Sequence, residues 1–220
     1  MLIKAKSLTY DDDFIIVQFA KEPVLGAVKT RLTPTLSQQQ ALNLHCSLVT
    51  LTFNTIANAK LGRQELWVGC HSKEGNATHD FFMQLVKQKT VEIYLQQGSD
   101  LGERMYHAAK ECLQRAARVV IVGSDCPFID ANYLASARQV LLAENPVVIG
   151  PANDGGYVLI GFTQVAPQLF AEVTWGSAQV LAQTRNNLHL LGWSWSELTA
   201  LDDIDRPEDL RLLPADVCPN

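Results

Sequence analysis

The sequence lacks the features that mark several common classes of protein. It contains neither the G-x-x-x-x-G-K-[ST] pattern of a P-loop nor the G-x-G-x-x-G pattern of a dinucleotide-binding fold. These absences argue against a P-loop kinase and a dehydrogenase. Basic residues are not in excess, because 18 Lys and Arg stand against 23 Asp and Glu. We therefore expect no nucleic-acid partner.

Cysteine patterns and long apolar runs are missing as well. The five cysteines are odd in number and form no C-x-x-C pair, which indicates neither a disulfide framework nor a zinc ribbon and favours reduced thiols. The five histidines show no metal-binding spacing. No apolar run approaches the ~20 residues that span a bilayer, and three Asp stand where a signal peptide would be apolar. We expect a cytoplasmic protein with no membrane span, and the sequence indicates no oligomeric state.

Short apolar runs alternate with segments of helical period along the whole chain. Strands are expected at 14–20, 65–70, 91–96, from 118, and at 146–152, 156–162 and 199–204. Helices are expected at about 37–59, 77–88, 101–117, 130–143, 177–188 and 207–213, the first with a capping box formed by Ser37 and Gln40. This order predicts one domain over residues 1–220, with a three-layer α/β/α architecture around a mostly parallel sheet. The two late strands, separated by "NDGG", predict a hairpin or a sharp turn.

The loop "KEPVLGAVKTRL" (21–32) follows the first expected strand and concentrates positive charge. In sheets of this class ligands bind at the carboxyl ends of the strands. Lys29 and Arg31 are two residues apart, so in an extended loop both can point to one side and bind phosphate oxygens. Gly26 allows close backbone approach, and Lys21 adds a cation at the start of the loop. The alternative is a solvated surface loop.

Two acidic segments follow later strands and are candidates for a metal site. Asp125 stands in the "GSDCP" turn, where one carboxylate together with substrate phosphates would suit Mg²⁺ or Mn²⁺. Its side chain could instead only cap the turn. Asp205 is the candidate second ligand, with Asp202 and Asp203 as substitutes. Alternatively, Asp205 is the N-cap of the last helix, with Glu208 at the N3 position.

The "NDGGY" segment (153–157) is the candidate acceptor site. Asp154 could bind sugar hydroxyls, an acceptor or a metal-bound water, and the following glycines allow close approach of the backbone. We assign Asp154, Gly155, Gly156 and Tyr157 to substrate binding, with a plain turn as the alternative. Gln97 and the backbone around Gly98, at the start of a helix, could read the edge of a nucleobase, or could form a simple helix-start turn.

The ordered set "KEPVLGAVKTRL", "GSDLGERM", "GSDCP", "DGGYVLIG" and "DIDRPEDL" resembles a bacterial family of proteins. These are GT-A-fold, nucleotide-diphospho-sugar-transferase-like proteins that are commonly described as glycosyltransferases, some in connection with arsenosugar biosynthesis. The chain is similar more distantly to MobA-like nucleotidyltransferases and to phospholactate guanylyltransferase, whose first loop also ends in K-[ST]-R-L. The resemblance covers residues 14 to 213. The first loop of this sequence lacks the G-x-G-T-R pattern of sugar nucleotidyltransferases. Asp125 is also not part of a complete D-x-D motif, which many glycosyltransferases use.

The resemblance implies a transferase that depends on a divalent metal and uses a nucleotide-activated donor. Lys29 and Arg31 would contact the nucleotide phosphates, and Asp125 with Asp205 would hold Mg²⁺ or Mn²⁺. The expected partners are a nucleotide or nucleotide-sugar and a small-molecule acceptor. We favour glycosyl transfer from a nucleotide-diphospho-sugar. Nucleotidyl transfer from a nucleoside triphosphate with release of pyrophosphate is the alternative, and a non-catalytic nucleotide-binding module is a third possibility.

Overall fold

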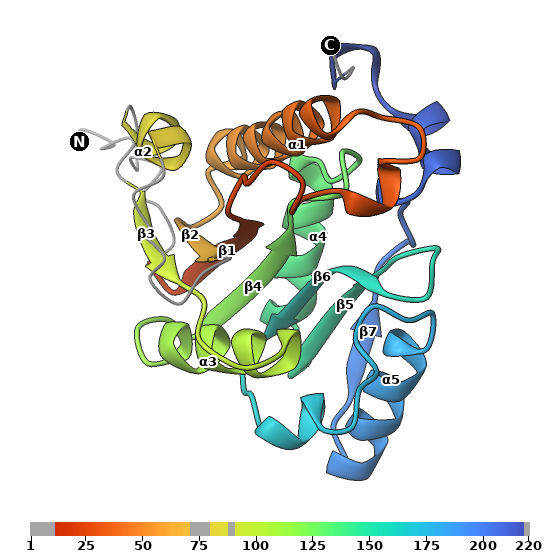
Figure 1. Cartoon of the computed structure of the whole chain (residues 1–220). Coiled ribbons are helices and arrows are strands. Elements are labelled where there is room, and N and C mark those ends of the chain that lie inside the picture. Colours follow the sequence, from red (N-terminus) through yellow and green to blue (C-terminus); the bar gives the residue numbers. More distant parts are fainter. Residues whose placement is uncertain (1–11, 71–79, 88–90, 218–220) are drawn as a thin grey trace, which may run out of the picture.

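The computed structural model describes residues 12–70, 80–87 and 91–217, which form a seven-stranded sheet between two layers of helices (Figure 1). The predicted three-layer α/β/α fold with a mostly parallel sheet is confirmed. The strand order is β3-β2-β1-β4-β6-β5-β7. The strands are β1 (Phe14–Lys21), β2 (Arg63–Gly69), β3 (Glu92–Leu95), β4 (Arg118–Gly123), β5 (Val147–Pro151), β6 (Tyr157–Phe162) and β7 (Trp195–Glu197).

Among the described residues, five α-helices and four short 3-10 helices accompany the strands, and the last two 3-10 helices follow the last strand. Their bounds are α1 (Gln38–Ala59), α2 (Asp80–Val86), α3 (Leu101–Leu113), α4 (Ala131–Leu142), α5 (Val180–Leu191), η1 (Thr30–Leu32), η2 (Pro167–Phe170), η3 (Pro207–Leu212) and η4 (Ala215–Val217). The capping box of Ser37 and Gln40 is confirmed, and Asp130 caps α4 through its carboxylate. The expected helix 101–117 already ends at Leu113. Parts of the expected helix 77–88 lie outside the described residues.

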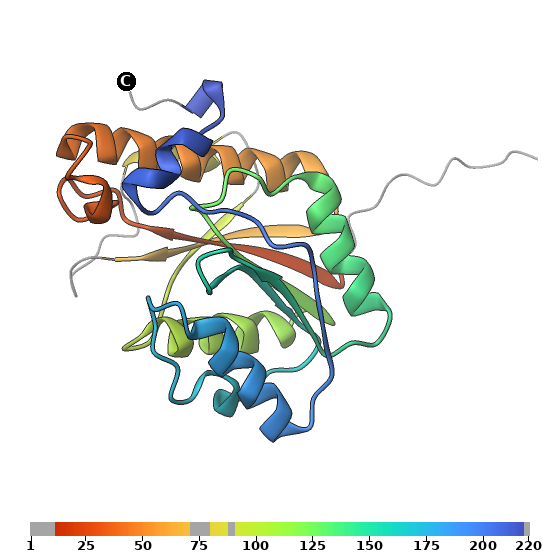
Figure 2. The ribbon, with the colours of Figure 1, turned by 90° about the vertical axis from the view of Figure 1, so that its right-hand side faces the viewer.

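β1 lies inside the sheet and is buried on both faces. Ile15 and Val17 pack toward α3, whereas Phe14 and Ile16 pack toward α1 and α4. This is the burial expected of a parallel strand covered by helices on both sides. Viewed edge-on, α1 and α4 lie on one face of the sheet and α3 and α5 on the other (Figure 2).

The expected hairpin is confirmed, but the expected last strand is wrong. β5 and β6 pair antiparallel around the "NDGG" turn. The last strand is β7, whose Trp195 pairs with Val147, and not the segment 199–204. Only Leu201 of that segment forms a bridge, with Ala152. The rest leaves the sheet because it crosses the carboxyl ends of the strands to reach the loops that follow β1 and β4.

The helices and the cysteines bear on two further expectations, the absence of a membrane span and of disulfide bonds. Among the described helices, none is both long enough and apolar enough to cross a membrane. Cys46, Cys70, Cys112 and Cys126 are free thiols, while Cys218 lies outside the described residues. Among the described residues, no disulfide joins any of these four.

Candidate functional site

The direction of the strand order reverses between β1 and β4, which are adjacent and parallel. β2 and β3 extend the sheet on one side, and β6, β5 and β7 extend it on the other. The loop after β1 and the segment that leads into η3 lie side by side next to this point (Figures 1 and 2). In open α/β sheets such a reversal creates the crevice in which ligands bind.

Lys29 is a buried cation held by oxygen atoms from two other loops. Its side chain is only 3% exposed, and its Nζ lies 2.5 Å from Oδ1 of Asp125. The same ammonium donates a hydrogen bond to the carbonyl oxygen of Ile204 at 2.5 Å. Lys29 has a φ of 49°, which is uncommon for a residue with a side chain. Strained backbone of this kind is concentrated at functional positions.

Arg31 is the second cation of the loop and pairs with the second predicted metal ligand. Its Nη1 lies 2.5 Å from Oδ2 of Asp205, and its Nη2 donates to the carbonyl oxygen of Gly176 at 3.4 Å. The hydrogen bond and charge of Asp205 raise the pKa of Arg31. Because about half of the Arg31 side chain is exposed, part of its guanidinium remains open to a ligand.

Asp125 lies at the end of β4, and its side chain is 49% exposed. Burial of part of the residue works to raise the pKa of Asp125, but the charge and hydrogen bond of Lys29, helped by His45 and Lys21, outweigh it. The pKa of Asp125 is therefore lower than its ordinary value. The carboxylate is ionised at neutral pH and can bind a cation.

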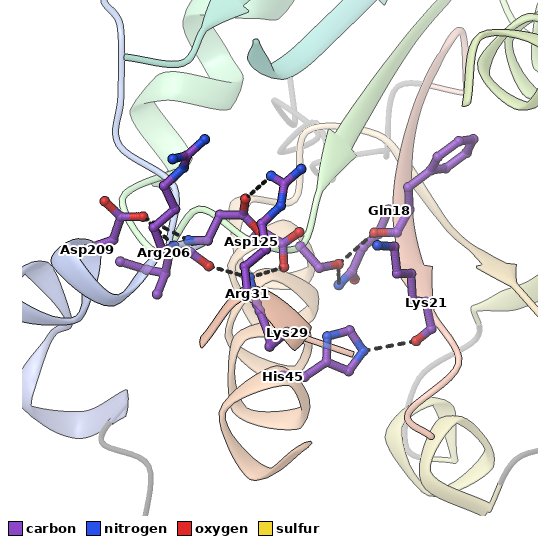
Figure 3. Close-up of polar contacts among 12 residues, drawn as sticks. Gln18, Lys21, Lys29, Arg31, His45, Asp125, Arg206 and Asp209 are labelled. Atoms are coloured by element: carbon purple, nitrogen blue, oxygen red, sulfur yellow. Dashed lines mark hydrogen bonds and ion pairs between the residues drawn. The ribbon is translucent and has the colours of Figure 1, made fainter. Parts of the chain in front are cut away.

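A buried polar network fixes the backbone next to Asp125. Gln18, which is fully buried in β1, donates from Nε2 to the carbonyl oxygen of Val49 at 2.9 Å and to Oγ of Ser124 at 3.0 Å (Figure 3). Ser124 in turn donates to the carbonyl oxygen of Phe19 at 2.7 Å. Since Ser124 directly precedes Asp125, this network ties the candidate ligand to α1 and β1.

Asp205 is not the N-cap of the last helix, so this alternative from the sequence is wrong. Arg206 occupies the cap position of η3. The carboxylate of Asp209 accepts hydrogen bonds from the backbone N–H groups of Asp205 at 3.1 Å and of Arg206 at 2.7 Å. The cap is thus shifted by one residue, and the Asp205 side chain is left to bind Arg31.

An acidic cavity of about 310 Å³ lies beside these ion pairs. Burial, together with the charges of Asp154, Asp125 and Asp205, raises the pKa of Asp203 from 3.8 to about 6. The side-chain amide of Asn153 donates to Oδ1 of Asp202 at 2.7 Å. The cavity is lined by Asn153, Asp154, Asp202, Asp203, Asp205, Arg206, Glu208 and Asp209. Asp154 and Asp205, predicted for different roles, therefore share one cavity.

The turn between β5 and β6 is constrained by its glycines. Gly155 has a φ of 93°, and a Cβ at this position would lie 2.2 Å from the carbonyl oxygen of Ala178. The carboxylate of Asp154 accepts a hydrogen bond from the N–H of Gly156 at 2.9 Å, which leaves its other oxygen for a ligand. The Tyr157 side chain is partly buried and packs against Trp175.

The remaining predicted residues lie at the edge of this arrangement. Gln97 and Gly98 follow β3 and are exposed, and the carbonyl oxygen of Gly98 accepts from Nε of Arg104 at 3.2 Å. Lys21 is exposed at the end of β1, and Gly26 has a φ of 76° in the loop. The structure thus pairs Lys29 with Asp125 and Arg31 with Asp205 by direct contacts. The candidate base-binding residues Gln97 and Gly98 lie outside these two pairs.

The sequence interpretation missed His45 and the loop around Gly176. His45 is buried in α1, and its Nε2 lies 3.0 Å from the carbonyl oxygen of Lys21 (Figure 3). Burial lowers the pKa of His45. Gly176, with a φ of 77°, contacts Arg31, and the neighbouring Trp175 packs against Tyr157. The "WGS" segment at 175–177 was the one sequence feature that could have indicated this loop.

The carboxylates of this site could hold a hard divalent ion only together with further ligands. Among the residues that the structure describes, no group of three or more His, Cys, Asp or Glu side chains is arranged to hold a metal ion. Asp125 nevertheless offers an ionised and half-exposed carboxylate at the strand-order reversal. One or two carboxylates completed by substrate phosphates is a common arrangement for Mg²⁺. The residues present are compatible with that arrangement.

The fold belongs to the class of nucleotide-diphospho-sugar-transferase-like α/β proteins. Over 89% of the chain, it superposes on 83% of a candidate nucleotide-diphospho-sugar transferase from Desulfovibrio desulfuricans G20, with 29% identity and a TM-score of 0.79. The family model DUF2064, described as an uncharacterized protein conserved in bacteria, matches residues 52–177. The chain belongs to this family. The resemblance identified from its motifs is therefore confirmed.

More distant structures share the fold alone. One is 4-diphosphocytidyl-2C-methyl-D-erythritol synthase from Anaerococcus prevotii DSM 20548, with 10% identity, a TM-score of 0.59 and coverage of 94% of this chain and 97% of the other. Another is Rv0371c from Mycobacterium tuberculosis H37Rv in complex with manganese, with 16% identity, a TM-score of 0.56 and coverage of 93% and 98%. A comparison with curated proteins found no match.

Proposed function

We propose that the protein is a transferase that uses a nucleotide-activated donor, and that the donor is a nucleotide-diphospho-sugar. The observation that carries this proposal is the meeting of Lys29 and Arg31 with Asp125 and Asp205 at the strand-order reversal. Two cations and two carboxylates at this point suit phosphate groups bound together with a divalent ion. The Desulfovibrio protein, described as a candidate nucleotide-diphospho-sugar transferase, supports the same donor class.

The proposed chemistry requires no protein nucleophile. Lys29 and Arg31 would bind the phosphate oxygens and neutralise the charge that develops as the nucleotide departs. Bound Mg²⁺ or Mn²⁺, held by Asp125 with Asp205, would supply further positive charge to the phosphates. Asp154 and Asp203 line the adjacent cavity, where an acceptor hydroxyl could be oriented and lose its proton. A carboxylate with a pKa of about 6, as at Asp203, is suited to accept a proton near neutral pH.

Nucleotidyl transfer is the second candidate. Its supporting observation is the pair of cations on one loop, because a triphosphate carries more negative charge than a diphosphate-sugar. The two reactions release different products. Glycosyl transfer from a nucleotide-diphospho-sugar releases a nucleoside diphosphate, whereas nucleotidyl transfer from a nucleoside triphosphate releases pyrophosphate.

A thermal-unfolding panel of nucleoside triphosphates and nucleotide-diphospho-sugars, with and without Mg²⁺ or Mn²⁺, tests the proposal. A ligand of the native state raises the unfolding temperature by mass action, and we expect a nucleotide-sugar with metal to give the largest rise. Asp125→Asn should abolish the metal-dependent part, whereas Glu208→Gln, at an exposed acid of the same cavity, should not. Metal-independent binding that Asp125→Asn leaves intact would favour a non-catalytic nucleotide-binding module.

A product assay then distinguishes the two reactions. Incubation with the preferred donor and candidate acceptors should release a nucleoside diphosphate. Release of pyrophosphate from a nucleoside triphosphate would contradict the sugar-donor proposal and support nucleotidyl transfer.

A further inference from the structure

Each candidate metal ligand of the site is already engaged by a cation of the phosphate loop. Lys29, which lies beside Asp125 in Figure 3, pairs with Asp125, and Arg31 pairs with Asp205, each at 2.5 Å. The two pairs differ in their surroundings. The Arg31 side chain is 52% exposed, whereas the Lys29 side chain is 3% exposed. Water can therefore screen Arg31 easily, but it reaches the Lys29 ammonium very little.

The position of Lys29 is fixed by more than its ion pair. Its ammonium also donates to the carbonyl oxygen of Ile204, a residue that is fully buried in a cluster with Leu32, Leu44 and Leu48. The N–H of Ile204 donates back to the carbonyl oxygen of Asp125 at 2.9 Å. Lys29, Ile204 and Asp125 thus form a closed set of contacts between the loop after β1, the loop after β4 and the C-terminal segment.

This geometry places a divalent ion and the Lys29 ammonium in competition for one carboxylate. An ion that approaches Asp125 alone meets a poorly screened positive charge next to its ligand. A nucleotide changes this situation, because its phosphates offer Lys29 other negative oxygen atoms and supply the ion with further ligands. Metal binding and nucleotide binding should therefore strengthen each other.

We propose that Lys29 couples the binding of a divalent ion to the binding of nucleotide phosphates by occupying Asp125 until phosphate oxygens bind the lysine. This inference rests on the proposed function, since it assumes that a nucleotide and a metal share the site. The coupling is reciprocal by thermodynamic necessity, so each ligand increases the affinity of the other by the same factor. Lys29 is therefore both a phosphate ligand and the group that limits binding of the metal alone.

The proposal makes an unusual prediction about the removal of a positive charge from the site. Lys29→Gln should bind Mn²⁺ alone about tenfold more tightly than the wild type, a factor within the usual range of coupling between sites. In the same variant the affinity for nucleotide should fall. Lys110→Gln is the control, because Lys110 has the same charge, is exposed on α3 and lies outside the loop that follows β1. Its affinity for Mn²⁺ alone should stay within about twofold of the wild type.

The experiment is a titration with MnCl₂, in which free Mn²⁺ is followed by electron paramagnetic resonance, with and without ADP, CDP, GDP or UDP. In the wild type, at least one nucleotide should tighten Mn²⁺ binding about tenfold, and Lys29→Gln should lose most of this gain. Lys29→Met is measured in parallel because it keeps the apolar stem in the buried position, and circular dichroism checks that each variant is folded.

The outcomes separate the coupling from the function. If a nucleotide and Mn²⁺ bind together to the wild type but neither folded Lys29 variant binds Mn²⁺ alone more tightly, the coupling is overturned and the proposed function stands. If the wild type binds none of the four nucleotides with Mn²⁺, both are overturned. Tighter binding of Mn²⁺ alone in a Lys29 variant, with nucleotide-dependent binding in the wild type, supports both.

Discussion

Replacing Asp203 with Asn should stabilise the protein at pH 8. Burial and the neighbouring acids Asp154, Asp125 and Asp205 raise the pKa of Asp203 from 3.8 to about 6. A carboxyl whose pKa is higher in the folded protein than in the unfolded chain costs stability once it ionises, and this cost is fully present above the folded pKa. A difference of two pKa units corresponds to about 3 kcal/mol. Because the Asp203 side chain is partly exposed, screening should reduce the gain to about 1–2 kcal/mol.

The pH dependence of the gain distinguishes this mechanism from a general effect of the substitution. Between pH 6 and pH 4 the stabilisation by Asp203→Asn should shrink, because Asp203 of the wild type takes up its proton and loses the penalty. Thermal unfolding at pH 8, 6, 5 and 4, in EDTA to exclude metal ions, measures this trend. At pH 8 the midpoint should rise by about 2–8 °C for a chain of this size.

The control is Glu208→Gln, which removes an exposed carboxylate from the same cavity. It should change the unfolding midpoint at pH 8 by less than half as much as Asp203→Asn. A gain that is the same at pH 4 and pH 8, or a loss of stability at pH 8, would refute the reasoning.

Three further substitutions test the structure around the site. Arg115→Met should cost about 2–4 kcal/mol in urea unfolding, because it leaves the buried carboxylate of Glu65 without the guanidinium at 2.6 Å; a cost below about 1 kcal/mol would contradict this. Asp209→Ala should cost about 1 kcal/mol, because it removes the carboxylate that accepts from the N–H groups of Asp205 and Arg206 before η3. It should also weaken nucleotide binding, whereas Asp209→Asn, which keeps an acceptor oxygen, should do so less. Gly155→Ala should destabilise the protein by more than Gly192→Ala, since both have positive φ but only at Gly155 would a Cβ meet backbone atoms; equal costs in thermal unfolding would argue against the steric explanation.

Local patterns were sufficient to locate most of the elements. The β-branched run at 14–20, the capping box at Ser37 and the carboxylate cap at Asp130 correspond to β1, α1 and α4. Each depends on residues that are close together in the sequence, so periodicity and capping residues identify them. The expected last strand failed because a pattern of side chains does not determine whether a segment stays in the sheet. Trp195, and not the segment 199–204, lies on the edge of β5.

The sequence by itself determined which residues stand in the loops that follow the strands. These include Lys29 and Arg31 after β1, Asp125 after β4, and the acids from Asp202 to Asp209 near the C-terminus. It also indicated the three-layer fold, because alternating apolar runs and helical segments bury their faces best in that way.

Only the tertiary structure decided which of these charges meet. The pairing of Lys29 with Asp125 follows from the adjacency of β1 and β4, and the pairing of Arg31 with Asp205 joins side chains 174 residues apart. No local pattern contains this information, because it depends on the order of the strands and on the path of the C-terminal segment across their carboxyl ends. The same path shifts the cap position of η3 to Arg206, whose N–H donates to Asp209, and leaves the carboxylate of Asp205 to bind Arg31.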